Sequence, residues 1–228
     1  MKRLLIVMFV ICASCSSVFA QVGSSTGNSV NSQEPENHAI EVQRLLLYHN
    51  SGEYEMQIRE VANAARDYLQ AKVAASAASS DKLAAVFDID ETALSSWAAM
   101  SDCGFCSYSV ESKLYTEDHN PAIAPVLELF NYAKKNGVHV FFLTGRHESE
   151  RDVTIKNLTE AGYSGWAELI LRPDNDKSPA RAFKPKERQK IEAKGYRIIL
   201  NIGDQASDLA GCCAERVFKL PNPFYLVQ

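Results

Sequence analysis

The chain of 228 residues has no internal repeat, no cluster of basic residues and no apolar run long enough to cross a bilayer. Hydrophobic residues make up 46% and charged residues 23%, values typical of a globular protein with one good core and room for a small subdomain. Acidic side chains outnumber basic ones, and the formal net charge is −4. We therefore expect no binding to nucleic-acid polymers or anionic membranes, because both bind basic surfaces.

The first twenty residues predict a signal peptide that is not part of the fold. Lys2 and Arg3 supply the positive start, the next residues are apolar, and cleavage is expected after Ala20. We therefore expect a periplasmic or secreted protein. Lipid anchoring through Cys15 is an alternative, although Cys12 stands where bacterial lipoprotein signals usually carry leucine.

The segment after the signal peptide predicts a flexible leader. Residues 21–37 are mainly Gly, Ser, Asn and Gln, without periodic apolar positions. The folded domain is then expected over residues 38–228. It starts with a helical extension over 38–78, where apolar residues recur at helical spacing and a break at Ser51 and Gly52 separates two helices.

Beyond this extension, strands alternate with helices. The predicted strands are 83–87, 138–143, 169–171, 197–202 and a weaker fifth at 217–220. The predicted helices are 125–135, 148–161 and 186–193, each with a glycine just beyond its end. This alternation predicts an α/β fold, a Rossmann-like parallel sheet with helices on both faces, in which ligands bind beyond the carboxyl ends of the strands.

Four cysteines remain after the predicted cleavage: Cys103, Cys106, Cys212 and Cys213. Their spacing is poor for a zinc site, whereas an even number in an oxidising compartment permits disulfides. We expect a bridge between Cys103 and Cys106. The alternative is that all four are reduced or merely buried small side chains.

Chemically active side chains gather where the predicted strands end. They are Asp88 and Asp90 after the first strand, Thr144, Gly145 and Arg146 after the second, and Asp204 and Asp208 after the fourth. Lys184 precedes the helix that leads into the fourth strand. Because like charges a few ångströms apart repel, several carboxylates at one edge of a sheet indicate that something positive binds there.

These residues carry a family resemblance. The patterns DxDxT at 88–92, an apolar strand ending in Thr144, an isolated Lys184 and GDxxxD at 203–208 resemble, in this order, the four motifs of the haloacid dehalogenase (HAD) superfamily. The segments FDIDETALS, FFLTGR, IGDQ followed by SDL, and FKLPNP are more specifically similar to the bacterial class B-like acid phosphatases and to the plant acid phosphatases and vegetative storage proteins. The resemblance covers residues 45–228.

The resemblance implies a HAD-like fold and a magnesium ion. It assigns Asp88 as the nucleophile that becomes phosphorylated, with the ion held by the Asp88 carboxylate, the backbone carbonyl of Asp90 and the Asp204 carboxylate. A carboxylate attacks phosphorus only if the charge of the incoming dianion is neutralised, and a hard cation with oxygen ligands does this.

The remaining roles follow from this chemistry. Asp90 is expected to protonate the leaving alcohol as general acid and then to activate water as general base. Thr144, the backbone N–H of Gly145 and Lys184 are expected to bind the phosphoryl oxygens. Asp208 is expected to hold Lys184 or a metal-bound water.

Each residue also has a simpler interpretation. Acidic pairs at strand ends are often solvated, a threonine there often caps a helix, and a lone lysine usually lies at the surface. Arg146 can support the site, but it can also pair with Glu148 or Glu150 on the following helix.

The segment 93–123 predicts a small lid that leaves the site open to small phosphomonoesters. Its aromatic residues Trp97, Phe105, Tyr108 and Tyr115 can stack on a substrate or simply pack against the amino-terminal helices. The sequence thus predicts a periplasmic or secreted magnesium-dependent acid phosphatase, a phosphoric monoester hydrolase that can form homo-oligomers. The alternatives are a storage protein and a phosphate-binding protein of the same fold, both without turnover.

Overall fold

The computed structural model describes residues 36–76, 78, 80–106 and 120–227. The predicted signal peptide, nearly all of the leader, and Tyr108 and Tyr115 of the predicted lid lie outside the described residues. Among the residues that are described, no helix is both long enough and apolar enough to cross a membrane.

Five parallel strands form one sheet in the order β3-β2-β1-β4-β5. They are β1 (Lys82–Phe87), β2 (His139–His147), β3 (Glu168–Arg172), β4 (Tyr196–Gly203) and β5 (Arg216–Lys219). The five predicted strands and the α/β fold class are therefore confirmed. β2 runs further than predicted, because His147 pairs with Arg172 of β3 beyond a register shift, so Thr144 to Arg146 lie within this strand.

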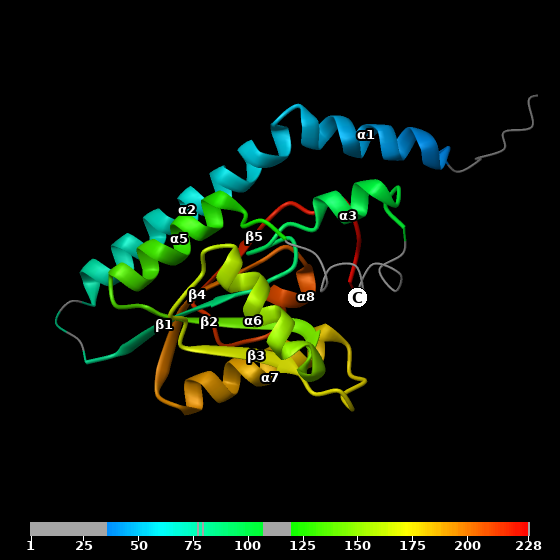
Figure 1. Ribbon diagram of the computed structural model, residues 1–228. Helices are drawn as coiled ribbons and strands as arrows, with labels where there is room; N and C mark the ends of the chain where they lie inside the picture. The colour runs from blue at the N-terminus through cyan, green and yellow to red at the C-terminus, as the bar shows by residue number, and fades with distance from the viewer. Residues whose placement is uncertain (1–35, 77, 79, 107–119, 228) are drawn as a thin grey trace, which may run out of the picture. The chain divides into compact units, whose positions relative to one another are not determined.

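Helices cover both faces of the sheet (Figure 1). Because side chains alternate along a strand, Ala85 and Phe87 of β1 pack in the larger core with α2 (Glu53–Ala75) and α5 (Ala124–Lys135). The side chains of β1 that point to the other face pack in a smaller core with α7 (Ala180–Ala193). The burial of nearly all of β1 explains why its sequence is continuously apolar.

The predicted helical extension forms α1 (His38–Asn50) and α2, and the predicted break between them is confirmed. Gly52 at this break has φ of 83°, a left-handed conformation that glycine adopts without steric cost. α1 buries none of its residues, whereas α2 buries five. The buried contacts of the extension with the domain thus come from α2, while partly buried side chains of α1 such as Leu45 and Tyr48 pack against the same core.

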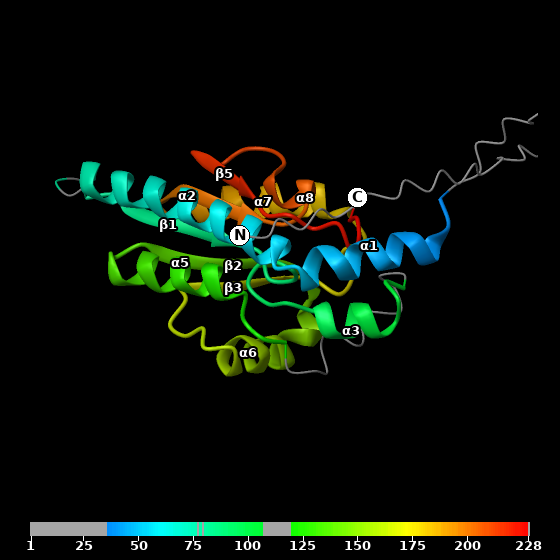
Figure 2. The same ribbon diagram turned by 90° about the horizontal axis from the view of Figure 1, so that it is seen from above.

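The described part of the predicted lid contains α3 (Trp97–Asp102), which lies beside α1 (Figure 2). Trp97 stacks on His49 of α1 with 3.6 Å between ring centroids, and Phe105 stacks on Phe224 at 5.7 Å. Trp97 therefore packs against an amino-terminal helix, as the simpler interpretation has it, whereas Phe105 packs against Phe224 instead. The predicted disulfide between Cys103 and Cys106 is present just after α3, and Cys212 and Cys213 are free.

Two helices differ from the prediction. The segment predicted as one helix over 148–161 is a 3-10 turn, η1 (Glu148–Glu150), followed by α6 (Arg151–Glu160). α7 begins at Ala180 instead of 186, so Lys184 lies within this helix and not before it. Proline is disfavoured inside helices, but α7 continues through Pro185.

Candidate active site

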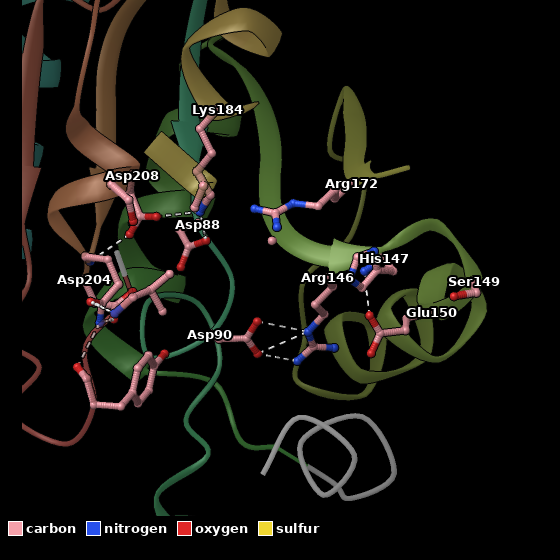
Figure 3. A pocket seen from close by; sticks show the side chains of 16 residues that line it. Asp88, Asp90, Arg146, His147, Ser149, Glu150, Arg172, Lys184, Asp204 and Asp208 are labelled. Carbon is pink, nitrogen blue, oxygen red and sulfur yellow. Dashed lines mark hydrogen bonds and ion pairs between the residues drawn. The ribbon is translucent and has the colours of Figure 1, made fainter. Parts of the chain in front are cut away.

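A cavity of about 290 Å³ opens at the carboxyl ends of β1, β2 and β4 (Figure 3). Seven of the eight predicted site residues line it: Asp88, Asp90, Gly145, Arg146, Lys184, Asp204 and Asp208. The eighth, Thr144, is fully buried, and its Oγ1 accepts a hydrogen bond from the backbone N–H of Arg146 at 3.1 Å. Residues that lie far apart in the sequence thus meet here because parallel strands end at one edge of the sheet.

Lys184 joins two carboxylates at the centre of the cavity. Its Nζ lies 2.5 Å from Oδ1 of Asp88 and 2.6 Å from Oδ1 of Asp208. Burial and the charge of Asp208 raise the pKa of Asp88 well above its ordinary value, although Lys184 opposes this shift. Burial lowers the pKa of Lys184, but the two carboxylates more than offset this effect, so the lysine stays charged.

Asp204 is held by neutral groups. Thr92 Oγ1 donates to its Oδ1 at 3.0 Å, and its Oδ2 accepts from Gln205 Nε2 at 2.6 Å and from Asn222 Nδ2 at 2.7 Å. Burial and the charge of Asp208 raise the pKa of Asp204 to about 7. These donors orient the carboxylate without neutralising its charge.

The donor set of the cavity fits a divalent metal ion. Asp88, Asp204 and Asp208 are buried, and each offers a carboxylate oxygen that lies within 4.8 Å of the other two. Lys184 supplies one positive charge to these three carboxylates. A cation with oxygen ligands would neutralise the remaining negative charge. Ser207 also lines the cavity, and its buried hydroxyl has no hydrogen-bond partner among the described residues.

Asp90 is held by Arg146. Nη2 of Arg146 lies 2.6 Å from Oδ1 of Asp90, and its Nε lies 3.1 Å from both carboxylate oxygens. On its other side, Nη1 of Arg146 reaches Thr154 Oγ1 of α6 at 3.3 Å. The alternative partners Glu148 and Glu150 bind other groups, whereas Arg146 lines the cavity and contacts Asp90.

The turn after β1 is held by the buried carboxylate of Glu91, to which the sequence analysis gave no role. Glu91 has φ of 52°, and its side chain, fully buried, accepts hydrogen bonds from the backbone N–H of Ser96 at 2.6 Å and from its hydroxyl at 3.0 Å. Burial raises the pKa of Glu91 to about 8. Its place inside DxDxT gave no sign of this structural role.

The turn after β4 is equally constrained. A Cβ atom on Gly203 would lie 2.5 Å from Cβ of Asp208, so only glycine fits beside this aspartate. Arg188, fully buried on α7, donates to the backbone carbonyls of Asp208, Ala210 and Cys212. Sequence reasoning also gave no roles to Gln205 and Asn222, although both lie in the segments IGDQ and FKLPNP that carry the family resemblance.

Comparisons with known proteins agree with this geometry. Residues 10–228 match the family model of the HAD superfamily, subfamily IIIB (Acid phosphatase). Acid phosphatase 1 of Solanum lycopersicum is 37% identical over 180 residues, which cover 76% of this chain and 69% of that protein. Vegetative storage protein 1 of Arabidopsis thaliana is 33% identical over 147 residues, 62% of this chain but only 54% of its own length.

A solved structure has the same fold. The class C acid phosphatase from Bacillus anthracis superposes with a TM-score of 0.66 over 81% of this chain and 86% of its own, at 22% sequence identity. At this identity the likeness concerns the fold alone. The family model, which matches residues 10–228, establishes that the chain belongs to the acid phosphatase family of the HAD superfamily, subfamily IIIB.

Proposed function

We propose that the protein is a periplasmic or secreted magnesium-dependent acid phosphatase that hydrolyses small phosphomonoesters through an aspartyl-phosphate on Asp88. The observation that carries this proposal is the meeting of Asp88, Asp90 and Asp204 around one cavity, with Lys184 bound to Asp88. The location rests on the predicted signal peptide. A homo-oligomer stays a prediction from the family resemblance.

Asp88 is the proposed nucleophile. Lys184 binds Oδ1 of this carboxylate and leaves Oδ2 without a hydrogen-bond donor among the described residues. An oxygen of Asp88 attacks phosphorus, the bond from phosphorus to the alcohol oxygen breaks, and the phosphoryl group stays on Asp88. Lys184 and the backbone N–H of Gly145, with Thr144 behind them, are the proposed donors to the phosphoryl oxygens.

Asp90 is the proposed general acid and base. It lies two residues beyond Asp88 and lines the same cavity. It gives its proton to the departing alcohol oxygen and then takes a proton from the water that attacks the aspartyl-phosphate. Arg146 is a positioning residue in this scheme, because its contacts fix where the Asp90 carboxylate lies.

The carboxylates of Asp88 and Asp204 and the backbone carbonyl of Asp90 would hold the magnesium ion. Asp208, with a carboxylate in the same cluster, would hold Lys184 in place and bind a water of the ion. When bound, the ion supplies positive charge that neutralises the phosphoryl oxygens and orients the group for in-line attack.

The experiment that tests this function is release of phosphate from p-nitrophenyl phosphate by the full chain at several pH values. We expect activity with magnesium, its loss with EDTA and its return when magnesium is added back. The variant Asp88→Asn, purified in the same way, controls for contaminating phosphatases and is expected to be inactive yet folded.

The same assay separates the enzyme from a second candidate. Similarity to the vegetative storage proteins favours a storage protein or a phosphate-binding protein without turnover. Such a protein would release no phosphate from any phosphomonoester in the presence of magnesium. That outcome would rule out the proposed enzyme.

A further inference from the structure

The wall of the cavity formed by β3 and α7 contains an arginine that the chemistry above does not use. Arg172 is the last residue of β3, pairs in register with His147 of β2 and lines the cavity. In Figure 3 its guanidinium points from β3 toward the side of the cavity where Lys184 and Asp88 lie. It therefore faces the space that a bound substrate would occupy.

Arg172 differs from the other arginine and lysine side chains of the cavity in having no carboxylate partner. Arg146 binds Asp90, and Lys184 binds Asp88 and Asp208. Within the described part of the chain, no carboxylate forms an ion pair with Arg172, and its buried Nε has no hydrogen-bond partner. A buried N–H without an acceptor in the protein is unusual, and its acceptor then comes from outside the chain, as a water or a ligand.

The surroundings hold this guanidinium in place. Its Cζ lies 5.5 Å from the ring centroid of Phe183, a buried residue of α7 next to Lys184. Asp176 lies on the neighbouring loop, but its carboxylate accepts a hydrogen bond from the backbone N–H of Ser178 at 2.7 Å instead. The cation is thus oriented by a ring, which leaves its N–H groups available to an anion.

We propose that Arg172 binds a second anionic group of the substrate, a carboxylate or a phosphate on the alcohol that leaves. The inference rests on the proposed phosphatase function. The phosphoryl group that is transferred already has Lys184 beside the nucleophile, and a cavity of about 290 Å³ also has room for a small leaving group. Preferred substrates are then small phosphomonoesters with two anionic groups.

The test compares substrates that differ in this second anion alone. The first pair is 3-phosphoglycerate and glycerol 3-phosphate, and the second is fructose 1,6-bisphosphate and fructose 6-phosphate. The wild type is expected to show the lower KM for the doubly anionic member of at least one pair. The first pair reports on a carboxylate and the second on a phosphate.

In Arg172→Gln, the ratio of kcat/KM between the members of the preferred pair should fall about tenfold or more, mainly through KM, as for loss of a charge-assisted hydrogen bond. Arg172→Lys should retain part of the preference because the charge remains. Arg181→Gln is the matched control: Arg181 is exposed at the start of α7, and the same loss of charge there should leave the ratio unchanged.

The outcomes separate this inference from the proposed function. If the wild type hydrolyses no phosphomonoester, the proposed function fails. If it hydrolyses both members of each pair equally well, the inference alone is overturned, and this result does not depend on any variant folding. If Arg172→Gln lowers kcat/KM equally for both members, Arg172 acts on the transferred phosphoryl group or on the fold, and the inference is likewise overturned.

Discussion

The two sides of the cavity hold their buried carboxylates in different ways. On one side, Lys184 forms ion pairs with Asp88 and Asp208. On the other, Asp204 receives hydrogen bonds from a hydroxyl and two amides, none of which carries a charge. The Lys184 side therefore has one cation of the protein for two carboxylates, whereas the Asp204 carboxylate has no cationic partner among these donors.

The largest effect is expected from Asp204→Asn, which removes the charge on the side without its own cation. Because a neutral amide is a poor ligand for magnesium, the concentration of magnesium needed for half-maximal phosphatase activity should rise at least about 100-fold. Asp174→Asn is the control, since Asp174 binds Ser149 and does not line the cavity. An unchanged magnesium response in Asp204→Asn would contradict the metal assignment.

The Lys184 side is tested by Lys184→Met, measured by denaturant unfolding with and without magnesium. Loss of the buried cation leaves two carboxylates without their partner, so the free energy of unfolding should fall by about 3–5 kcal/mol. Lys190→Met removes an exposed lysine of the same helix that pairs with Glu187, and should cost about 0–1 kcal/mol. Equal effects of the two substitutions would show that Asp88 and Asp208 do not depend on Lys184.

Arg146 extends the comparison to a third carboxylate. Arg146→Gln should lower kcat about 10- to 100-fold and change the pH profile of kcat, because Asp90 loses the contacts that place it as general acid and base. Arg151→Gln is the matched control, since Arg151 pairs with Glu148 outside the cavity. A uniform loss of activity without any change in the pH profile would indicate a structural role only.

The pH dependence of stability of the metal-free protein tests the buried carboxylates that have no cationic partner. Burial raises the pKa of Asp204 from 3.8 to about 7 and that of Glu91 from 4.5 to about 8. The folded state therefore binds these protons more tightly than the unfolded state does. The free energy of unfolding should fall as pH rises from about 4 to about 8, by up to about 1.4 kcal/mol per pH unit for each group.

Thermal unfolding in EDTA across this range measures the slope, and saturating magnesium should reduce it because the ion favours the ionised form of Asp204. A metal-free protein that became more stable between pH 4 and pH 8 would mean that the charges of these buried carboxylates are compensated within the protein.

The carboxylates are the part of the candidate site that the sequence predicts best. Asp88 and Asp204 follow apolar runs that read as parallel strands, and such strands end at one edge of a sheet whatever the connections between them. The partner of Arg146 was not accessible in this way. The sequence offered Glu148 and Glu150 as partners of Arg146. That Arg146 binds Asp90 instead depends on how far β2 extends beside β3.

The position of Lys184 illustrates a second limit. Pro185 is a strong local signal against a helix, and the packing of Phe183 and Ile191 in the smaller core outweighs it. Such a contest between local preference and tertiary packing cannot be decided from the sequence. The neutral donors to Asp204 could not be predicted either. Thr92 and Asn222 belong to different segments of the chain, and only the fold brings both of them to Asp204.

The close approach of Gly203 to Asp208 has a consequence for engineering. With 2.5 Å between the added Cβ and that of Asp208, even a methyl group would displace the aspartate from Lys184 without altering any polar atom. Libraries that aim at new substrates should therefore leave the backbone around Gly203 untouched and diversify the wall that carries Arg172. There, Arg172 forms no ion pair with a carboxylate of the described residues, so its replacement leaves the partners of Lys184 and Asp90 in place.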